Sequence, residues 1–235
     1  MKPYTDTYQK TMIPIHGKPL LEYIIEGVKT IGIKDFVIVV SYRKEQIIDY
    51  FQYGSKWNIR MEYVEQKELN GTGGALLLCE DLIKEKHFFL TWGDILVPYY
   101  VYQEAYATFK NENQNFILVT NYQENLQKGC EIHLEGDYLE KMIEKPPKEE
   151  QCSNLNNCGI FIFSKDVFEE VKQLTPSQRG ELELPDAISK GVREKNWKVR
   201  IIKMKPGEFR GDFGDLRVYE LLKKDSEWLR KVVAY

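Results

Sequence analysis

The chain has 235 residues, enough for one domain with a sizeable core, and a formal net charge of −3. This charge gives no basic footprint, so nucleic acid is not an expected partner, although 33 Lys and Arg leave room for a local phosphate site. The four cysteines lack the spacing of a zinc site or a short disulfide framework, and no apolar run approaches the ~20 residues that span a bilayer. We therefore expect a cytoplasmic protein with no membrane partner.

The first half of the chain alternates helical and strand patterns. Pro19 precedes an amphipathic helix that ends near Gly32, and residues 35–40 form a continuous apolar strand. The elements predicted next are a helix over 44–51, a strand over 60–64, a helix over 75–83 and a strand over 87–92. This rhythm predicts an α/β fold with a doubly wound, mostly parallel, Rossmann-like sheet.

Short strands dominate the second half. A hairpin is predicted from residues 131–134 and 138–143, because Glu135-Gly136-Asp137 between them is a turn sequence. The polar segment 146–153 reads as an exposed loop that could close over a substrate. The remaining predicted elements are strands over 115–120, 157–163 and 198–204 and helices over 181–195 and 215–232. The hairpin predicts a small β annex beside the main sheet.

Three short motifs point to one chemistry. A glycine turn, Gly71-Thr72-Gly73-Gly74, precedes a helix, Asp94 follows a buried strand, and Glu144-Lys145-Pro146 follows the hairpin. Ligands of a doubly wound sheet gather at the carboxyl ends of its strands, where Asp94 and the glycine turn both fall. A glycine turn can meet a nucleotide, an acidic residue can hold a metal and a lysine can hold a phosphate. Together they indicate nucleotidyl transfer.

The chain resembles the sugar-1-phosphate nucleotidyltransferases, the family that makes nucleotide sugars. The resemblance covers essentially the whole chain in six segments: residues 1–20, 65–75, 93–94, 144–146, 157–161 and 181–188. It implies the nucleotide-diphospho-sugar transferase type of fold, with the β annex serving the sugar. It also implies one nucleotidyltransferase domain over 1–235, in which 1–120 mainly binds the nucleotide and 121–235 mainly binds the sugar phosphate.

The resemblance implies a reaction and its catalytic residues. A nucleoside triphosphate would be joined to a sugar 1-phosphate with release of pyrophosphate, and Asp94 and Asp212 would hold the cofactor Mg²⁺. Lys10 would reach the phosphates in the transition state, and Lys145 would grip the phosphate of the sugar. The alternatives are a helix N-cap near Gly214 for Asp212 and a solvated surface position for either lysine.

Substrate contacts are implied in the same way. Gln66, Gly71 and Thr72 would bind the nucleotide; an amide such as Gln66 can pair with uracil or thymine, which favours UTP or dTTP, and Gly71 would let the backbone approach the base. Glucose 1-phosphate is the default sugar, with its contacts at Gly129, Glu144, Lys145, Asn157 and Glu183. The alternatives are a strand-end ion pair for Glu144 and a solvent-facing position for Glu183.

The chain departs from the family at its beginning. Members start with a hydrophobic strand and a glycine-rich loop ending Gly-Thr-Arg, which holds the triphosphate, whereas here the segment that follows this loop stands at Met1. Three explanations are open: an internal start within a longer protein, a truncated paralogue, or replacement of the strand by a segment such as 231–235. The later site residues favour the first. If the chain is complete, we expect weak triphosphate binding, so a catalytically weak or silent nucleotide-sugar-binding paralogue is the alternative function.

Oligomeric state is left open by the sequence. Tyr and Trp residues on the late helices, if exposed, could support a homo-oligomer.

Overall fold

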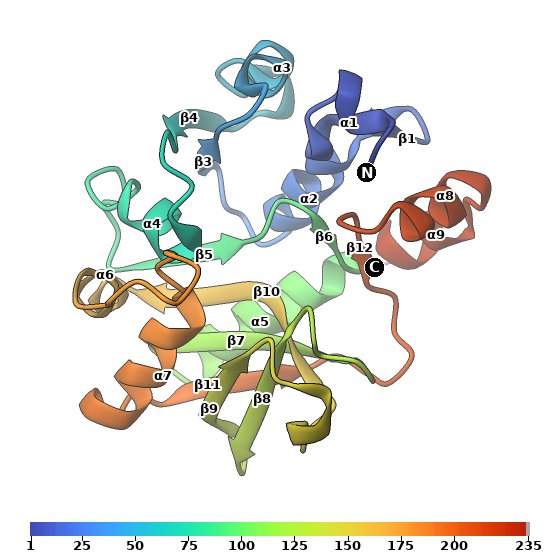
Figure 1. The fold of residues 1–235 in the computed structure, drawn as a ribbon. Coiled ribbons are helices and arrows are strands. Elements are labelled where there is room, and N and C mark those ends of the chain that lie inside the picture. The colour runs from blue at the N-terminus through green and yellow to red at the C-terminus, as the bar shows by residue number, and fades with distance from the viewer. Residues whose placement is uncertain (234–235) are drawn as a thin grey trace. The chain divides into compact units, whose positions relative to one another are not determined.

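A computed structural model describes residues 1–233 (Figure 1). The chain divides into two compact units that are interleaved in sequence. Unit 1 consists of Met1–Lys67, Trp92–Glu104 and the segment from Phe209 onward, and unit 2 consists of Glu68–Thr91 and Ala105–Glu208. Residues 234–235, at the end of the segment 231–235 considered above, lie outside the described residues.

Unit 1 is built from short helices and three small strand pairs. Its helical elements are α1 (Tyr4–Thr7), η1 (Lys10–Met12), α2 (Leu20–Lys29), α3 (Lys44–Phe51), η2 (Ser55–Trp57), α8 (Leu216–Lys224) and α9 (Glu227–Val233). Its strands are β1 (Pro14–Ile15), β2 (Lys18–Pro19), β3 (Asp35–Val40), β4 (Arg60–Glu65), β6 (Ile95–Leu96) and β12 (Gly211–Asp212). β3 and β4 pair in parallel, whereas β1–β2 and β6–β12 are antiparallel.

The core of unit 1 confirms the apolar patterns read from the sequence. The helix predicted after Pro19 is α2, and the strand predicted over 35–40 is β3. Phe36 and Ile38 of β3 pack against one buried cluster, as the alternation of side chains along a strand requires. That cluster consists of Met12, Leu21, Ile25, Val40, Ile47, Phe51, Trp57, Ile59 and Met61.

Unit 2 contains the large sheet. Its strands are β5 (His87–Thr91), β7 (Phe116–Tyr122), β8 (Cys130–Glu135), β9 (Tyr138–Glu144), β10 (Leu155–Ser164) and β11 (Val199–Lys203). Its helical elements are α4 (Gly71–Leu77), η3 (Lys148–Glu150), α6 (Asp166–Lys172) and α7 (Leu184–Lys195), and α5 (Tyr99–Asn111) contributes residues to both units.

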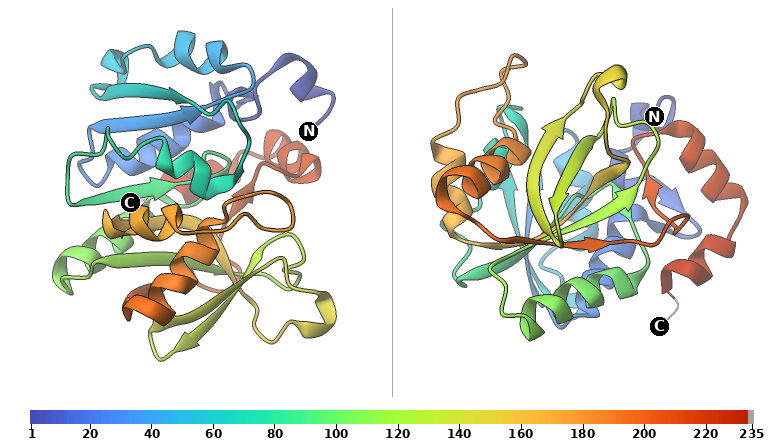
Figure 2. Two further views of the ribbon diagram at one scale, coloured as in Figure 1. Left: turned by 60° about the vertical axis from the view of Figure 1, so that its left-hand side comes forward. Right: turned by 90° about the horizontal axis from the view of Figure 1, so that it is seen from below.

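The six strands of unit 2 follow the order β5-β10-β7-β11-β9-β8 (Figure 1). Asn156 of β10 also pairs with Glu131 of β8, so five of the strands close into a small barrel. Figure 2 shows α7 and the second half of α5 on opposite faces of this sheet. The predicted hairpin is confirmed as β8–β9, and it belongs to the barrel rather than standing apart from the sheet.

The prediction of a mostly parallel sheet is wrong. Of the strand pairs among residues 1–233, β3–β4 and β7–β11 are parallel and the others are antiparallel. β5, β7 and β11 do share one direction, but β10 lies between β5 and β7 and runs against both. A fully buried apolar strand has the same pattern in either direction, and β10 follows the hairpin through a loop instead of a crossover helix.

Several helix boundaries differ from the predictions. The helix predicted over 75–83 is α4, which already begins at Gly71 and ends at Leu77. The helix predicted over 215–232 is divided into α8 and α9, because Asp225 is extended and its side chain accepts a hydrogen bond from Glu227 N. α5 and α6 were not predicted; α5 is rich in tyrosine, which blurs the separation between an apolar and a polar face.

None of the helices in residues 1–233 combines the length and the apolar character needed to cross a membrane.

Candidate functional site

The first group of candidate residues in unit 1 centres on an ion pair between Lys10 and Asp94. Lys10 opens η1, and Asp94 lies in the turn between Gly93 and β6. Lys10 Nζ donates a hydrogen bond to Asp94 Oδ2 over 2.5 Å. The two side chains are 37% and 27% exposed, so both remain open to solvent and to a substrate. Lys10 is therefore held by a carboxylate in the turn before β6 rather than being free on the surface.

Asp212 lies on the strand paired with the one that follows Asp94. It stands opposite Ile95 in the β6–β12 ladder, and Phe213 N donates to Asp94 O over 3.0 Å, so the two aspartates have neighbouring backbones. Asp212 Oδ1 accepts from Gly214 N and its Oδ2 accepts from Arg210.

The N-cap of α8 is Asp215, whose side chain accepts from Arg217 N. The alternative that Asp212 is a helix N-cap is therefore wrong; its side chain closes a turn instead.

The donor set of Asp94 and Asp212 is suited to Mg²⁺. This ion commonly takes one or two carboxylates and fills its other positions with phosphate oxygens and water. Both aspartates are partly exposed, at 27% and 44% of the side chain. Residues 1–233 hold no group of three or more His, Cys, Asp or Glu that could form a metal cage on its own. A magnesium ion shared with a phosphate substrate needs no such cage.

Gln66 directly follows β4 at the carboxyl end of the parallel β3–β4 pair. Its backbone N–H donates to Val40 O over 2.8 Å, which extends the ladder by one residue. The backbone of Gln66 is thereby fixed at the edge where ligands of parallel strands gather.

In unit 2, the glycine turn packs against the segment that leads into α7. Gly71 has φ +95°, and a Cβ there would lie 2.7 Å from Leu182 O. Gly73 N donates to the same carbonyl over 2.8 Å, and Thr72 Oγ1 accepts from Leu184 N over 3.1 Å. The close backbone approach that Gly71 allows is thus made to the chain itself, and Thr72 caps α7.

Glu144 and Lys145 lie where β9 ends. Lys145 has the left-handed φ of +48°, and its N–H donates to Gly129 O over 2.8 Å. Glu144 stands opposite Cys130 in the β8–β9 ladder. A Cβ on Gly129 would lie 2.3 Å from Asn156 Oδ1, so only glycine fits there. Gly129 therefore fixes the backbone of Lys145 through close packing and a hydrogen bond.

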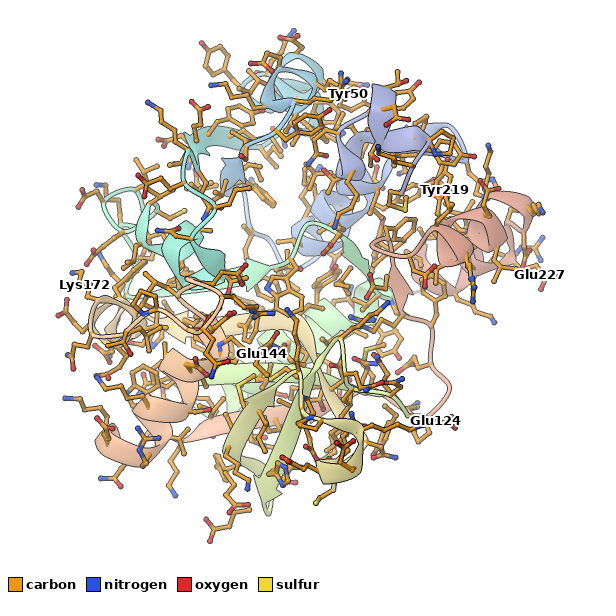
Figure 3. The ribbon with its side chains drawn as sticks, viewed as in Figure 1. Tyr50, Glu124, Glu144, Lys172, Tyr219 and Glu227 are labelled. Carbon is orange, nitrogen blue, oxygen red and sulfur yellow. The ribbon has the colours of Figure 1, made fainter. Side chains whose placement is uncertain are left out.

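Arg179 gathers three carboxylates of unit 2. Its Nη2 lies 2.5 Å from Glu183 Oε1, 3.5 Å from Glu181 Oε2 and 3.9 Å from Glu144 Oε1. Lys145 Nζ also lies 3.9 Å from Glu144 Oε1. Glu144, labelled in Figure 3, thus has two cations near the same carboxylate oxygen. Sequence reasoning missed Arg179; the signal available was a lone arginine in an Arg-Gly turn directly before two glutamates.

Burial raises the proton affinity of two carboxyls in this part of unit 2, Glu144 and Asp186. Burial raises the pKa of Glu144 to about 7, the charge of Glu183 adds to the rise, and Arg179 opposes it. Burial also raises the pKa of Asp186, again with a contribution from Glu183. The side chain of Glu183 is only 7% exposed, so the alternative in which it faces solvent is wrong.

Asn157 offers a hydrogen-bond donor in β10. The residue is 1% exposed and its Oδ1 accepts from Gly159 N over 2.8 Å. Its Nδ2 is buried and has no hydrogen-bond partner among residues 1–233. The β10–β7 register is irregular between Asn157 and Phe161, as is common beside functional sites. A buried unpaired donor is costly, which favours a polar ligand as its partner.

Comparisons with known proteins agree with the fold. A model of the nucleotidyl transferase family matches residues 1–221. The "bifunctional protein GlmU" of Methanococcus maripaludis is 34% identical over 99% of this chain and 52% of its own length. A putative UTP–glucose-1-phosphate uridylyltransferase of Methanocaldococcus jannaschii is 25% identical, covering 83% of this chain and 78% of its own.

A crystal structure of a UDP-glucose pyrophosphorylase complexed with UDP-glucose superposes with a TM-score of 0.84 and 26% identity, covering 98% of this chain and 94% of that one. The chain spans about half the length of the GlmU relatives it matches. The protein belongs to the nucleotidyl transferase family, within its sugar-1-phosphate nucleotidyltransferases. The resemblance read from the motifs and the α/β nucleotidyltransferase fold are confirmed.

Proposed function

We propose that the protein joins UTP or dTTP to glucose 1-phosphate, with Mg²⁺ as cofactor, giving a nucleoside diphosphate glucose and pyrophosphate. The observation that carries this proposal is the pair of cations, Lys145 and Arg179, each 3.9 Å from Oε1 of the half-buried Glu144. Cations suit a sugar phosphate, and a carboxylate beside them suits sugar hydroxyls. Two relatives are described by UTP and glucose 1-phosphate or by UDP-glucose, which supports the choice of substrates.

The chemistry is a displacement at phosphorus. An oxygen of the sugar phosphate attacks the α-phosphorus of the triphosphate, and the bond from this phosphorus to the bridging oxygen of the departing pyrophosphate breaks. Two anions must approach each other, so charge neutralisation and alignment dominate the catalysis. Lys10 supplies positive charge to the phosphates, and Asp94 fixes the position of its ammonium group.

Asp94 and Asp212 are the residues that would hold Mg²⁺. When bound, the ion would neutralise charge on the triphosphate and help to orient it. Asp212 now accepts from Arg210, and Asp94 accepts from Lys10, so both carboxylates already have cationic partners that a metal would join or replace.

The sugar phosphate is assigned to residues of unit 2. Lys145 and Arg179 bind its phosphate, and Glu183 positions Arg179 through the 2.5 Å contact. Glu144 accepts hydrogen bonds from sugar hydroxyls, and the unpaired Nδ2 of Asn157 donates one. Gly129 acts through the backbone by holding Lys145.

The nucleotide is assigned to Gln66, Gly71 and Thr72. The side-chain amide of Gln66 pairs with the edge of uracil or thymine, because it offers a donor and an acceptor side by side. Gly71 and Thr72 contribute backbone shape, since the Thr72 hydroxyl already caps α7. The division into a mainly nucleotide-binding part, 1–120, and a mainly sugar-phosphate-binding part, 121–235, remains part of this proposal.

Pyrophosphate release tests the proposal. The chain is incubated with Mg²⁺, glucose 1-phosphate and one of UTP, dTTP, CTP, GTP or ATP, and we expect release with UTP or dTTP that EDTA abolishes. No release with any of the five, by this chain and by a form extended upstream of Met1, would contradict the enzyme. Calorimetry with UDP-glucose then distinguishes the enzyme from the alternative function. Binding without turnover identifies a silent nucleotide-sugar-binding protein, and the absence of both turnover and binding excludes both functions.

A further inference from the structure

The side-chain amide of Gln46 holds the segment that leads into Lys10. Gln46 lies in the first turn of α3, and its Oε1 accepts from Gln9 N over 2.7 Å. Its Nε2 donates to Thr7 O over 2.8 Å. One side chain therefore makes two hydrogen bonds to the backbone of residues 7–9, as a neighbouring strand would.

The backbone that follows Lys10 is fixed as well. Gln9 is the N-cap of η1, and its Oε1 accepts from Thr11 N and from Thr11 Oγ1, over 2.5 Å and 2.7 Å. Met12 is buried in the same cluster as Ile47, the residue after Gln46. Lys10 is thus fixed at the backbone before and after it, and its side chain is free to make the ion pair with Asp94.

We propose that Gln46 is a positioning residue that acts through Lys10. This inference rests on the proposed function. Gln46 keeps the ammonium of Lys10 at Asp94, where the ammonium meets the phosphates in the transition state. A lysine side chain has several rotatable bonds, so the position of its ammonium depends on a fixed backbone. Loss of this position lowers the rate of the reaction rather than the affinity for glucose 1-phosphate.

Substitutions of the Gln46 amide can separate an effect on Lys10 from a general loss of stability. Glutamate in place of Gln46 keeps the acceptor for Gln9 N and loses the donor for Thr7 O, whereas alanine loses both bonds. Arg43 Nη2 independently donates to Asp6 O over 2.6 Å, so the segment keeps one anchor to the start of α3 in either variant. Glu45 is exposed on the same helix turn and serves as the matched control.

The test combines kinetics with the chemical reactivity of Lys10. In Gln46→Ala we expect kcat to fall about 10-fold while KM for glucose 1-phosphate stays within twofold, with a smaller loss in Gln46→Glu and none in Glu45→Ala. The rate of amine acetylation at Lys10, measured by mass spectrometry against the exposed Lys34, should rise about threefold or more in Gln46→Ala, because the ammonium spends less time against Asp94.

Each outcome is decisive. A kcat within twofold of wild type in Gln46→Ala overturns the proposal. An increase in KM for glucose 1-phosphate as large as the fall in kcat also overturns it, and so does an equal fall in kcat in the Glu45→Ala control. An unchanged acetylation rate at Lys10 overturns the route through Lys10 even if kcat falls. If the wild-type chain shows no turnover, the proposed function has failed, and the acetylation rate alone still decides whether Gln46 fixes Lys10.

Discussion

The ion pair of Lys10 with Asp94 has more consequence for turnover than for stability. Both side chains are about one-third exposed, so we expect Asp94→Asn to change the free energy of unfolding by less than about 1 kcal/mol. Turnover should fall at least about 100-fold, roughly 2.7 kcal/mol in the barrier, since the variant loses the charge that fixes Lys10 and would help to hold Mg²⁺. Pyrophosphate release and urea midpoints measure the two effects.

Asp35→Asn is the matched control for this prediction. Asp35 forms an ion pair with Arg60 at the start of β3, in the same unit but outside the candidate residues. The control should keep wild-type turnover. Equal turnover in the two variants would remove Asp94 from the catalytic machinery.

Glu144 makes stability depend on pH. Its carboxyl has a pKa of about 7 in the folded chain and titrates near 4.5 when unfolded. Between these values the folded state binds more protons, so the free energy of unfolding falls as pH rises from about 4.5 to about 7 and is constant with respect to this group above that. The fall should be on the order of 3 kcal/mol.

Urea midpoints at pH 5, 6, 7 and 8 measure this slope in the wild type and in Glu144→Gln. The variant cannot ionise and should lose most of the decline, keeping the smaller part that Asp186 contributes with the same sign. A decline of the same size in both proteins would show that Glu144 does not retain its proton in the fold.

At the scale of elements, the start of α4 and the segment before α7 depend on each other. A side chain at Gly71 would meet the backbone of Leu182 at 2.7 Å, and φ is +95°. We expect Gly71→Ala to lower the free energy of unfolding by about 3 kcal/mol or more. Gly136 also has positive φ, +63°, but faces open space, so Gly136→Ala should cost about 1 kcal/mol. Equal urea midpoints for the two variants would contradict the packing argument.

Elements with a clear period were predictable from the sequence, and strand direction was not. α2, β3 and the β8–β9 hairpin follow from apolar spacing and turn residues. The antiparallel course of β10 does not, because its neighbours β5 and β7 are fixed by pairing over long sequence separations. The break between α8 and α9 depends on the local hydrogen bond of Asp225, which competes with the helix.

The candidate residues show the same division. Asp94 and Glu144 were predicted as polar residues at strand ends; Glu144 is the last residue of β9, and Asp94 lies in the turn between β5 and β6. Arg179 and Gln46 were missed, because the role of each depends on a contact with a residue distant in sequence. Arg179 lies near Glu144, and Gln46 accepts a hydrogen bond from Gln9 N. A single sequence does not show which distant residues such side chains contact.

At the scale of the whole molecule, the interleaving of the two units decides which fragments can fold. Residues 1–120 lack β12, the partner of β6, and they lack the buried Tyr219 and Trp228 of unit 1. Residues 68–208 contain all segments of unit 2. We therefore expect 68–208 to show cooperative thermal unfolding by circular dichroism and 1–120 to show none. Cooperative unfolding of 1–120 would contradict this division of the chain.

The β6–β12 pair also sets the order of events during synthesis. Ile95 and Leu96 are buried in the finished protein, yet their ladder partners, Gly211 and Asp212, leave the ribosome much later. At 5–20 residues per second, this interval lasts on the order of ten seconds. Until then the apolar segment next to Asp94 is without the strand with which it pairs in the folded protein.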